Sequence, residues 1–164
     1  MKDKGKLFIN VASSVFVVDG YLNFDNHIFL KLAKFVPWAG FFLPIKYRQF
    51  FDAYRNAIKI ADLRIHECRK PLPLEKGSVD HILCSHFLEH VYPKEAENIL
   101  KGFHKTLKAS GTLHIIVPDL GLIIEKYNSS RSTTAADEFM LQTLLSHAEP
   151  PSLKYRLLDF FGSS

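Results

Sequence analysis

The sequence is poor in cysteine, in tryptophan and in long hydrophobic runs. Its 164 residues include two cysteines, Cys68 and Cys84, which have neither the number nor the spacing of a disulfide framework or a zinc site. No apolar run reaches the length of a membrane span, and no signal peptide follows the basic first residues. No dense basic run carries a nucleic-acid-binding motif. These absences predict a cytoplasmic protein without a metal site, a transmembrane segment or a nucleic-acid partner.

The remaining composition is that of a folded globular protein. Hydrophobic residues make up 47% of the chain and charged residues 23%, which is not typical of a disordered chain. The length suits a single domain over residues 1–164 with one sizeable core. The net charge of +4 is a mild excess that suits an anionic substrate or a membrane surface.

Two short apolar runs open the chain. Residues 7–11 (LFINV) have the near-continuous apolar pattern of a strand buried on both faces. Asp19-Gly20 then separates residues 15–18 (VFVV) from residues 21–24 (YLNF), which is a typical signal for a two-residue β-hairpin. The alternative is a crossover that leads to a second, parallel strand at residues 21–24. Such a crossover normally needs a dozen or more residues, and only nine are available.

Residues 26–56 are unusually rich in aromatic and basic side chains. Nine aromatic residues, among them Trp38, are mixed with five lysines and arginines. Helical spacing predicts one helix before Pro37 and a second over residues 45–54. Two interpretations stay open. The segment is either an insertion that packs its aromatic residues onto the domain, which is the commoner outcome, or a lid, acceptor site or peripheral membrane contact.

The second half of the chain alternates strands with helices. Short apolar runs predict a third strand at residues 58–61, a fourth at residues 79–84 and a fifth at residues 113–117. Between the last two, Pro93 suits the first turn of an amphipathic helix. This alternation predicts a doubly wound, mostly parallel α/β sheet.

Residues 78–120 (SVDHILCSHFLEHVYPKEAENILKGFHKTLKASGTLHIIVPDL) run in the order strand, acidic-histidine segment, helix, Gly turn, strand and Pro-Asp. This segment resembles the second half of a class I S-adenosylmethionine-dependent methyltransferase of type 11, and the resemblance extends more weakly over residues 7–127. It implies a Rossmann-like methyltransferase fold, the cofactor S-adenosyl-L-methionine and methyl transfer to a small-molecule or saccharide-type acceptor. It also favours parallel first strands, because the family has a short connection there.

Ligands of a doubly wound sheet bind outside the carboxyl ends of its strands. The resemblance assigns the cofactor to the following residues at those ends: Asn10, Val11, Ala12, Ser13, Asp25, Asp62, Leu63 and Ser85. It gives the ribose hydroxyls to Asp25 after the second strand, and the adenine amino group to Asp62 after the third. From the residues alone, Asp25 also suits an Asx-turn or a helix cap, and Asp62 also suits a solvated loop carboxylate.

The first of these loops contains no glycine. The family has a glycine-rich loop there, which lets the backbone approach the cofactor closely. This chain has the small residues of Asn10-Val11-Ala12-Ser13-Ser14 instead. They still permit a close approach, but any of them with a positive φ would be strained.

His86 follows the fourth strand in the segment SHFLEH, residues 85–90. The resemblance turns His86 toward the cofactor crevice, where a neutral imidazole can accept a proton from an acceptor hydroxyl. The same segment matches the pattern H-x-x-E-H, in which two histidines on one helix bind zinc in a hydrolase. A strand leads directly into the motif and Pro93 follows it at once, so we expect no such helix and no metal ligands.

From residue 120 onward the pattern is helical, most clearly over residues 136–146. Methyltransferases of this fold usually complete the sheet with an antiparallel pair of strands, and no strand signal follows residue 117. We therefore expect a truncated product or an open sheet edge that pairs with a partner, such as a second copy in a homodimer. Together with the glycine-free loop, this predicts weak or absent methyl transfer. The alternative function is a non-catalytic methyltransferase-like domain that binds a ligand or a partner.

Overall fold

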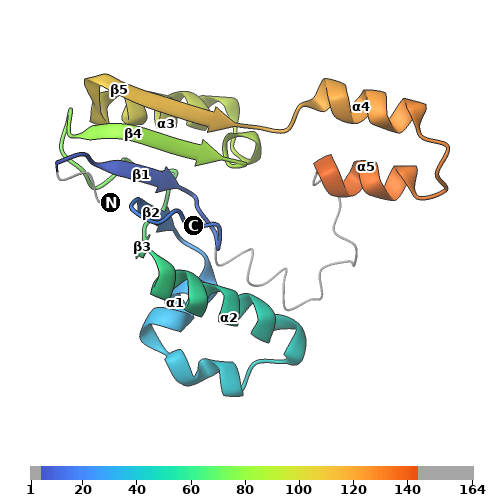
Figure 1. Ribbon diagram of the computed structural model, residues 1–164, viewed down its shortest axis with the longest axis horizontal. Helices are drawn as coiled ribbons and strands as arrows, with labels where there is room; N and C mark the ends of the chain where they lie inside the picture. Colours follow the sequence, from blue (N-terminus) through green and yellow to red (C-terminus); the bar gives the residue numbers. More distant parts are fainter. Residues whose placement is uncertain (1–4, 144–164) are drawn as a thin grey trace. The chain divides into compact units, whose positions relative to one another are not determined.

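The computed structural model describes residues 5–143, and the chain divides into two compact units with the boundary after Val117. The first unit contains a five-stranded sheet with its helices, and the described part of the second contains two helices (Figure 1). The single domain expected over residues 1–164 therefore stays a prediction.

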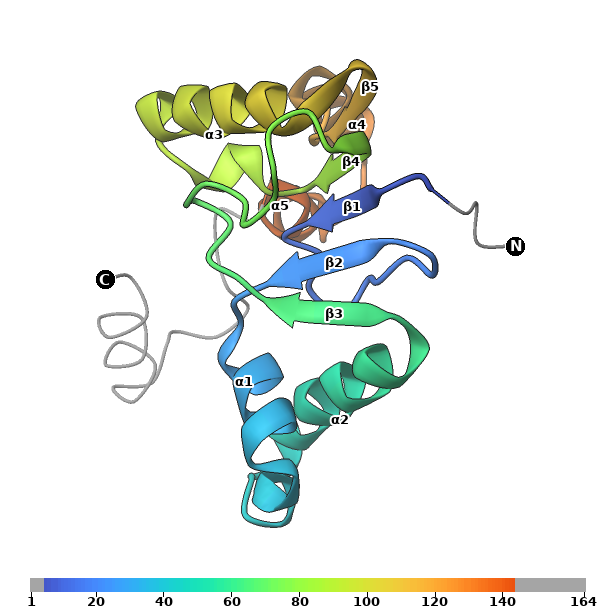
Figure 2. The same cartoon turned by 90° about the vertical axis from the view of Figure 1, so that its left-hand side faces the viewer.

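The first unit is a parallel sheet with helices on both faces. Its strands are β1 (Phe8–Val11), β2 (Leu22–Asp25), β3 (Asp62–Ile65), β4 (Val79–Ser85) and β5 (Leu107–Ile116). Its α-helices are α1 (Ile28–Phe35), α2 (Ile45–Ile60) and α3 (Pro93–Thr106), and its 3-10 helices are η1 (Pro37–Phe41) and η2 (Leu88–His90). The strands lie in the order β3-β2-β1-β4-β5 and all pairs are parallel (Figure 2). The predicted doubly wound α/β fold is confirmed.

One face of the sheet packs against α3. The apolar residues of β1 and β4 alternate toward this face and are buried with the apolar side of the helix: Ile9, Val11, Ile82, Cys84, Ile99 and Phe103. Pro93 begins α3 as predicted, and the Glu95 side chain accepts a hydrogen bond from the N–H of Tyr92 (3.0 Å). A free N–H at the helix start is thereby satisfied.

Two buried asparagines hold the connection between β1 and β2, which contains no helix. Asn10 donates to the carbonyl of Phe16 (3.1 Å) and to Oδ1 of Asn23 (3.0 Å). Asn23 accepts from the N–H of Val18 and donates to the Val18 carbonyl. These side chains satisfy backbone groups that would otherwise be unpaired beside the sheet. Residues 15–18 form no strand, and the β-hairpin interpretation is wrong because β1 and β2 pair in parallel.

α1, η1 and α2 form a helical hairpin, residues 28–60, with an apolar core of its own. That core reaches β3 and includes Leu30, Ala33, Phe51, Tyr54, Ala57 and Leu63. The predicted third strand at residues 58–61 is wrong, because residues 58–60 form the last turn of α2. Ala57 follows Tyr54 on the buried side of the helix, so packing against α1 extends α2 into residues 58–60. The apolar pattern of these residues suits a helix or a strand.

β5 begins directly after α3 and contains an irregularity. Its pairing with β4 shifts register between Val79 and His81. Gly111 lies in this part of β5, where a Cβ atom would stand 2.9 Å from the carbonyl oxygen of Val79. Only glycine fits so close to the neighbouring backbone. The Gly turn expected between helix and strand is therefore part of the strand itself.

Asp80 joins the starts of three strands and makes the unit lose stability at acid pH. Its carboxylate accepts from the Lys108 ammonium (2.7 Å) and from the N–H of Leu7 (2.8 Å), and these bonds hold the pKa of Asp80 below its usual value. The stabilisation is complete above the unfolded-state pKa of about 3.9 and is lost as the pH falls through the lower folded-state pKa. Below about pH 4, we expect the melting temperature of Asp80→Asn to fall less steeply with decreasing pH than that of the wild type. Parallel melting curves for the two proteins across this range would contradict the assignment.

The second unit pairs α4 (Leu120–Ser129) with α5 (Ala135–Thr143). Asp119 caps α4 by accepting from the N–H of Leu122 (3.0 Å). Tyr127 and Phe139 form the apolar contact between the helices, with ring centroids 5.2 Å apart. No strand follows β5 within the described residues up to 143, and residues 144–146 of the predicted helix lie outside them.

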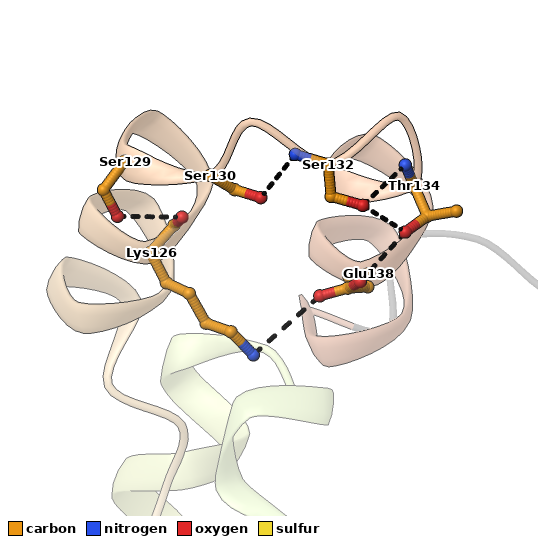
Figure 3. Close-up of polar contacts among 6 residues, drawn as sticks. All are labelled: Lys126, Ser129, Ser130, Ser132, Thr134 and Glu138. Atoms are coloured by element: carbon orange, nitrogen blue, oxygen red, sulfur yellow. Dashed lines mark hydrogen bonds and ion pairs between the residues drawn. The ribbon is translucent and has the colours of Figure 1, made fainter.

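Short polar contacts close the turn of this helix pair (Figure 3). Ser132 accepts from the N–H of Thr134 (3.1 Å), and the Thr134 hydroxyl donates to Glu138 (3.0 Å). Lys126 lies 4.0 Å from the other oxygen of Glu138. These exposed contacts shape the turn but suggest no reactive group.

Candidate functional site

The sheet reverses its strand order between β1 and β4, and ligands of doubly wound folds bind outside the carboxyl ends at such a switch point. We call the residues at these ends the strand-end site. It comprises residues 12–14, which follow β1, and the segments 25–26, 65–67 and 85–86, which begin with the last residue of β2, β3 and β4. The N–H of Ser13 donates to the carbonyl of Phe24 (3.0 Å), which joins the first two segments.

Backbone strain is concentrated at this site. Three non-glycine residues in the described part of the chain have a positive φ: Ala12 (55°), Ser14 (50°) and His86 (51°). The first two follow β1 and the third follows β4. This conformation costs an ordinary residue about 1–2 kcal/mol, and such strain is commonly retained where a ligand binds. The loop without glycine therefore adopts the backbone that glycine would adopt without strain.

Asp25 connects three segments of the first unit. It is 8% exposed, and its carboxylate accepts from the N–H of His27 (2.7 Å), the N–H of Ser14 (2.9 Å) and the hydroxyl of Tyr54 (3.2 Å). The bond from His27 is the Asx-turn that the residue pattern also suggested. Burial and the nearby carboxylate hold the pKa of Tyr54 far above its usual value, so the phenol remains a donor. Asp25 thus lies at the predicted site, but its oxygens are used by the protein.

The four residues predicted from the first loop divide into two pairs. Ala12 and Ser13 lie at the strand-end site. Asn10 and Val11 are only 3% and 0% exposed, and they belong to the β1–β2 connection and to the α3-side core. The structure therefore engages these two side chains inside the domain and not at the site.

Asp62 is separated from the other predicted residues. It is the first residue of β3, so it lies at the amino end of a parallel strand, opposite the strand-end site. Its exposed carboxylate pairs with Arg64 (2.9 Å), in agreement with the alternative of a solvated carboxylate. Leu63 is 2% exposed in the core of the helical hairpin. The structure therefore corrects the predicted placement of Asp62 and Leu63. Both predictions came from the strand that was expected at residues 58–61.

Glu67 is the acidic residue that follows the carboxyl end of β3. Asp25 pairs with Ile65 in the register, and Asn26 donates to Glu67 Oε2 (2.9 Å). The other oxygen of Glu67 accepts from the N–H of Arg69 (3.2 Å). The correct boundary of β3 was the one signal that could have identified Glu67 from the sequence.

His66 carries a buried polar atom without a partner. Its Nε2 makes no hydrogen bond within residues 5–143, although its backbone N–H donates to the carbonyl of Asp25 (2.9 Å). Its ring contacts that of Phe24, with centroids 5.4 Å apart. Buried polar atoms are almost always paired. This nitrogen is therefore an unused hydrogen-bonding group in the segment that follows β3.

Ser85 ends β4 and is half-buried, and His86 follows with an exposed side chain. Nδ1 of His86 lies 3.4 Å from Glu89 Oε1. The zinc interpretation requires both histidines on one helix. It is wrong, because His90 ends a three-residue 3-10 helix that does not include His86. Within the described residues, no group of three or more His, Cys, Asp or Glu side chains is arranged to hold a metal ion.

The two cysteines are free and buried, as their pattern suggested. Burial is the main reason that the pKa of Cys68 and that of Cys84 rise to about 12. Both thiols therefore stay protonated at neutral pH and cannot act as nucleophiles.

Residues 48–115 match the family model described as a methyltransferase domain, of type 11. Among solved structures, the PH0226 protein of Pyrococcus horikoshii is similar at 16% identity and a TM-score of 0.49, with 80% of this chain and 57% of that chain covered. A SAM-dependent methyltransferase of Thermotoga maritima has 16% identity, a TM-score of 0.46 and coverages of 84% and 62%. One from Aquifex aeolicus has 14% identity, a TM-score of 0.39 and coverages of 70% and 57%. No curated protein matches the chain.

The parallel sheet with its switch point defines a Rossmann-like fold. The chain spans about three fifths of the length of the solved structures named above. The family match adds the particular class: residues 48–115 match a type 11 methyltransferase model, and the resemblance of residues 78–120 to the class I, type 11 methyltransferases is confirmed.

Proposed function

We propose that this chain binds S-adenosyl-L-methionine at the strand-end site and serves methyl transfer to a small-molecule or saccharide-type acceptor. The observation that carries the proposal is the coincidence of the three non-glycine positive-φ residues of the described chain with the ends of β1 and β4, at the switch point of a methyltransferase-related sheet. Strain retained at that position is expected of a ligand site.

The residues present fit the cofactor on chemical grounds. Asp25 and Glu67 supply carboxylate oxygens, which suit ribose hydroxyls and an adenine amino group, and His66 supplies an unpaired ring nitrogen. A carboxylate has about four acceptor positions, and Asp25 uses three of them. A ribose at Asp25 therefore takes the remaining position or replaces the Tyr54 hydroxyl.

The bound cofactor would supply a methyl group on a sulfonium, open to in-line attack by an oxygen, nitrogen or carbon nucleophile. The work of this chain is then to hold and orient the reactants. His86 is exposed beside the site and can accept the proton of an acceptor hydroxyl. Glu89, 3.4 Å from Nδ1 of His86, stabilises the imidazolium that forms.

Calorimetry with S-adenosylhomocysteine tests the cofactor assignment. We expect Glu67→Gln to weaken binding by about tenfold, because a charged acceptor at the end of β3 is lost. Asp62→Asn is the matched control at the other end of the same strand and should leave the affinity unchanged. Equal losses for both variants, or no binding by the wild type, would sink the proposal.

A second function is favoured by one observation, the three hydrogen bonds that Asp25 already accepts from protein donors. A domain that keeps this carboxylate for its own stability is suited to a non-catalytic role in binding a partner. Thermal stabilisation by the cofactor separates the two functions, since only a domain that binds it gains stability as its concentration rises.

A further inference from the structure

The turn of the helical hairpin exposes a run of large apolar side chains that are close together in the sequence. Within eleven residues they are Phe35 (75% exposed), Trp38 (60%), Phe41 (84%), Phe42 (79%) and Ile45 (78%). Figures 1 and 2 show this turn at the end of the hairpin that lies away from the strands. Scattered apolar residues are normal on a protein surface, but a contiguous group marks an interaction site.

The exposed run is held in place by contacts beneath it. Gly40 lies directly on the buried ring of Phe51, where an added Cβ would stand 2.8 Å from a ring carbon. Arg48 donates to the carbonyl of Gly40 (3.1 Å) and to that of Leu43 (3.5 Å). Because the hairpin core is complete without the outer aromatic residues, folding of the hairpin does not explain why they are present.

Basic charge surrounds these aromatic residues. Residues 28–60 contain six lysines and arginines and one acidic residue, a net charge of +5. The whole chain carries +4, so the other residues together carry −1. The positive charge of the protein is thus gathered in the segment that exposes its aromatic side chains, and Lys34 and Lys46 flank the exposed run.

We propose that the hairpin turn docks on an anionic lipid bilayer, with Trp38, Phe41 and Phe42 at the level of the headgroups. Tryptophan and phenylalanine on an exposed turn suit the interface between headgroups and acyl chains. Basic residues around them complement an anionic surface. No described helix is long and apolar enough to cross a membrane, so this contact is peripheral. The proposal is independent of the methyl-transfer function.

Trp38 is the only tryptophan of the chain and therefore reports directly on this contact. The full chain is mixed with vesicles of phosphatidylcholine alone, and with vesicles that also contain phosphatidylglycerol. We expect co-sedimentation and a blue shift of the tryptophan emission with the anionic vesicles only. High salt should reverse both, because it screens the charges.

Two double variants separate the apolar and the electrostatic contributions. Phe41→Ser with Phe42→Ser should weaken partitioning by more than about tenfold, since it removes the inserted rings. Lys34→Glu with Lys46→Glu should weaken partitioning into anionic vesicles by at least about tenfold. Each basic residue near such a surface raises the binding constant by about fivefold. Phe16→Ser is the matched control: Phe16 is 81% exposed but lies outside the hairpin. Circular dichroism verifies that each variant is folded.

Three results would overturn the proposal. One is full vesicle binding by the Phe41/Phe42 variant, or a loss of binding by the Phe16 control as large as that of the Phe41/Phe42 variant. Another is the absence of any emission shift with anionic vesicles. The third is a wild-type molar mass of a dimer that becomes monomeric in the Phe41/Phe42 variant, since a second copy of the chain would then cover the exposed run.

Discussion

Replacement of Asp25 with alanine is expected to lower the free energy of unfolding by about 3 kcal/mol or more. The buried carboxylate accepts bonds from Ser14, His27 and Tyr54, which belong to three separate segments. Without it the N–H groups of Ser14 and His27 lose this acceptor and Tyr54 keeps only the Ser14 hydroxyl, and each buried donor left unsatisfied costs about 1–3 kcal/mol. Urea unfolding followed by circular dichroism measures the difference. Asp25→Asn retains one acceptor oxygen, that of its amide. Its free energy of unfolding should lie between those of the wild type and the alanine variant.

Asp62→Ala is the matched control for this experiment. Asp62 is also an acidic residue of a strand terminus, but its side chain is 55% exposed and pairs only with Arg64 in the described contacts. An exposed ion pair contributes about 0–1 kcal/mol, so a small change is expected. Similar losses at both positions would show that the hydrogen bonds of Asp25 are not what holds the three segments together.

Replacement of Phe51 with alanine is expected to cost about 3–5 kcal/mol. The Phe51 ring is fully buried at the centre of the helical hairpin and packs against Gly40. Its removal leaves a cavity that the short helices cannot fill, and the turn that carries Trp38 loses its support. Thermal unfolding gives the loss of stability, while the emission of Trp38 shows whether the hairpin opens before the sheet.

Phe50→Ala provides the control from the adjacent position. Phe50 is 60% exposed and stacks loosely on Phe29, with ring centroids 6.5 Å apart. Because little of its surface is removed from solvent, we expect a change of about 0.5 kcal/mol. A comparable loss from both variants would mean that the hairpin does not have the core described for it.

The strands at the centre of the sheet were predictable because they are short and rich in apolar residues. Residues 7–11 are a nearly continuous apolar run, residues 79–84 contain four apolar residues, and β1 and β4 occupy these two segments. The third strand was not predictable. Residues 58–61 are as apolar as a strand, but they follow a helix whose buried side continues through Ala57, and β3 begins at Asp62. That error placed the expected acidic residue at Asp62, whereas Glu67 is the acidic residue that follows the carboxyl end of β3.

The sequence by itself determined the class of fold, the central strands β1 and β4 and the relation of residues 78–120 to methyltransferases, because apolar runs and amphipathic helices leave periodic, local signals. The tertiary structure alone decided which polar groups meet. Asp25 is bonded by Tyr54, which is 29 residues away, and Phe51 is buried while the adjacent Phe50 is exposed. Such contacts depend on how α1, α2 and the strands pack together. No local pattern encodes them, since the same residue types occur in partners and non-partners alike.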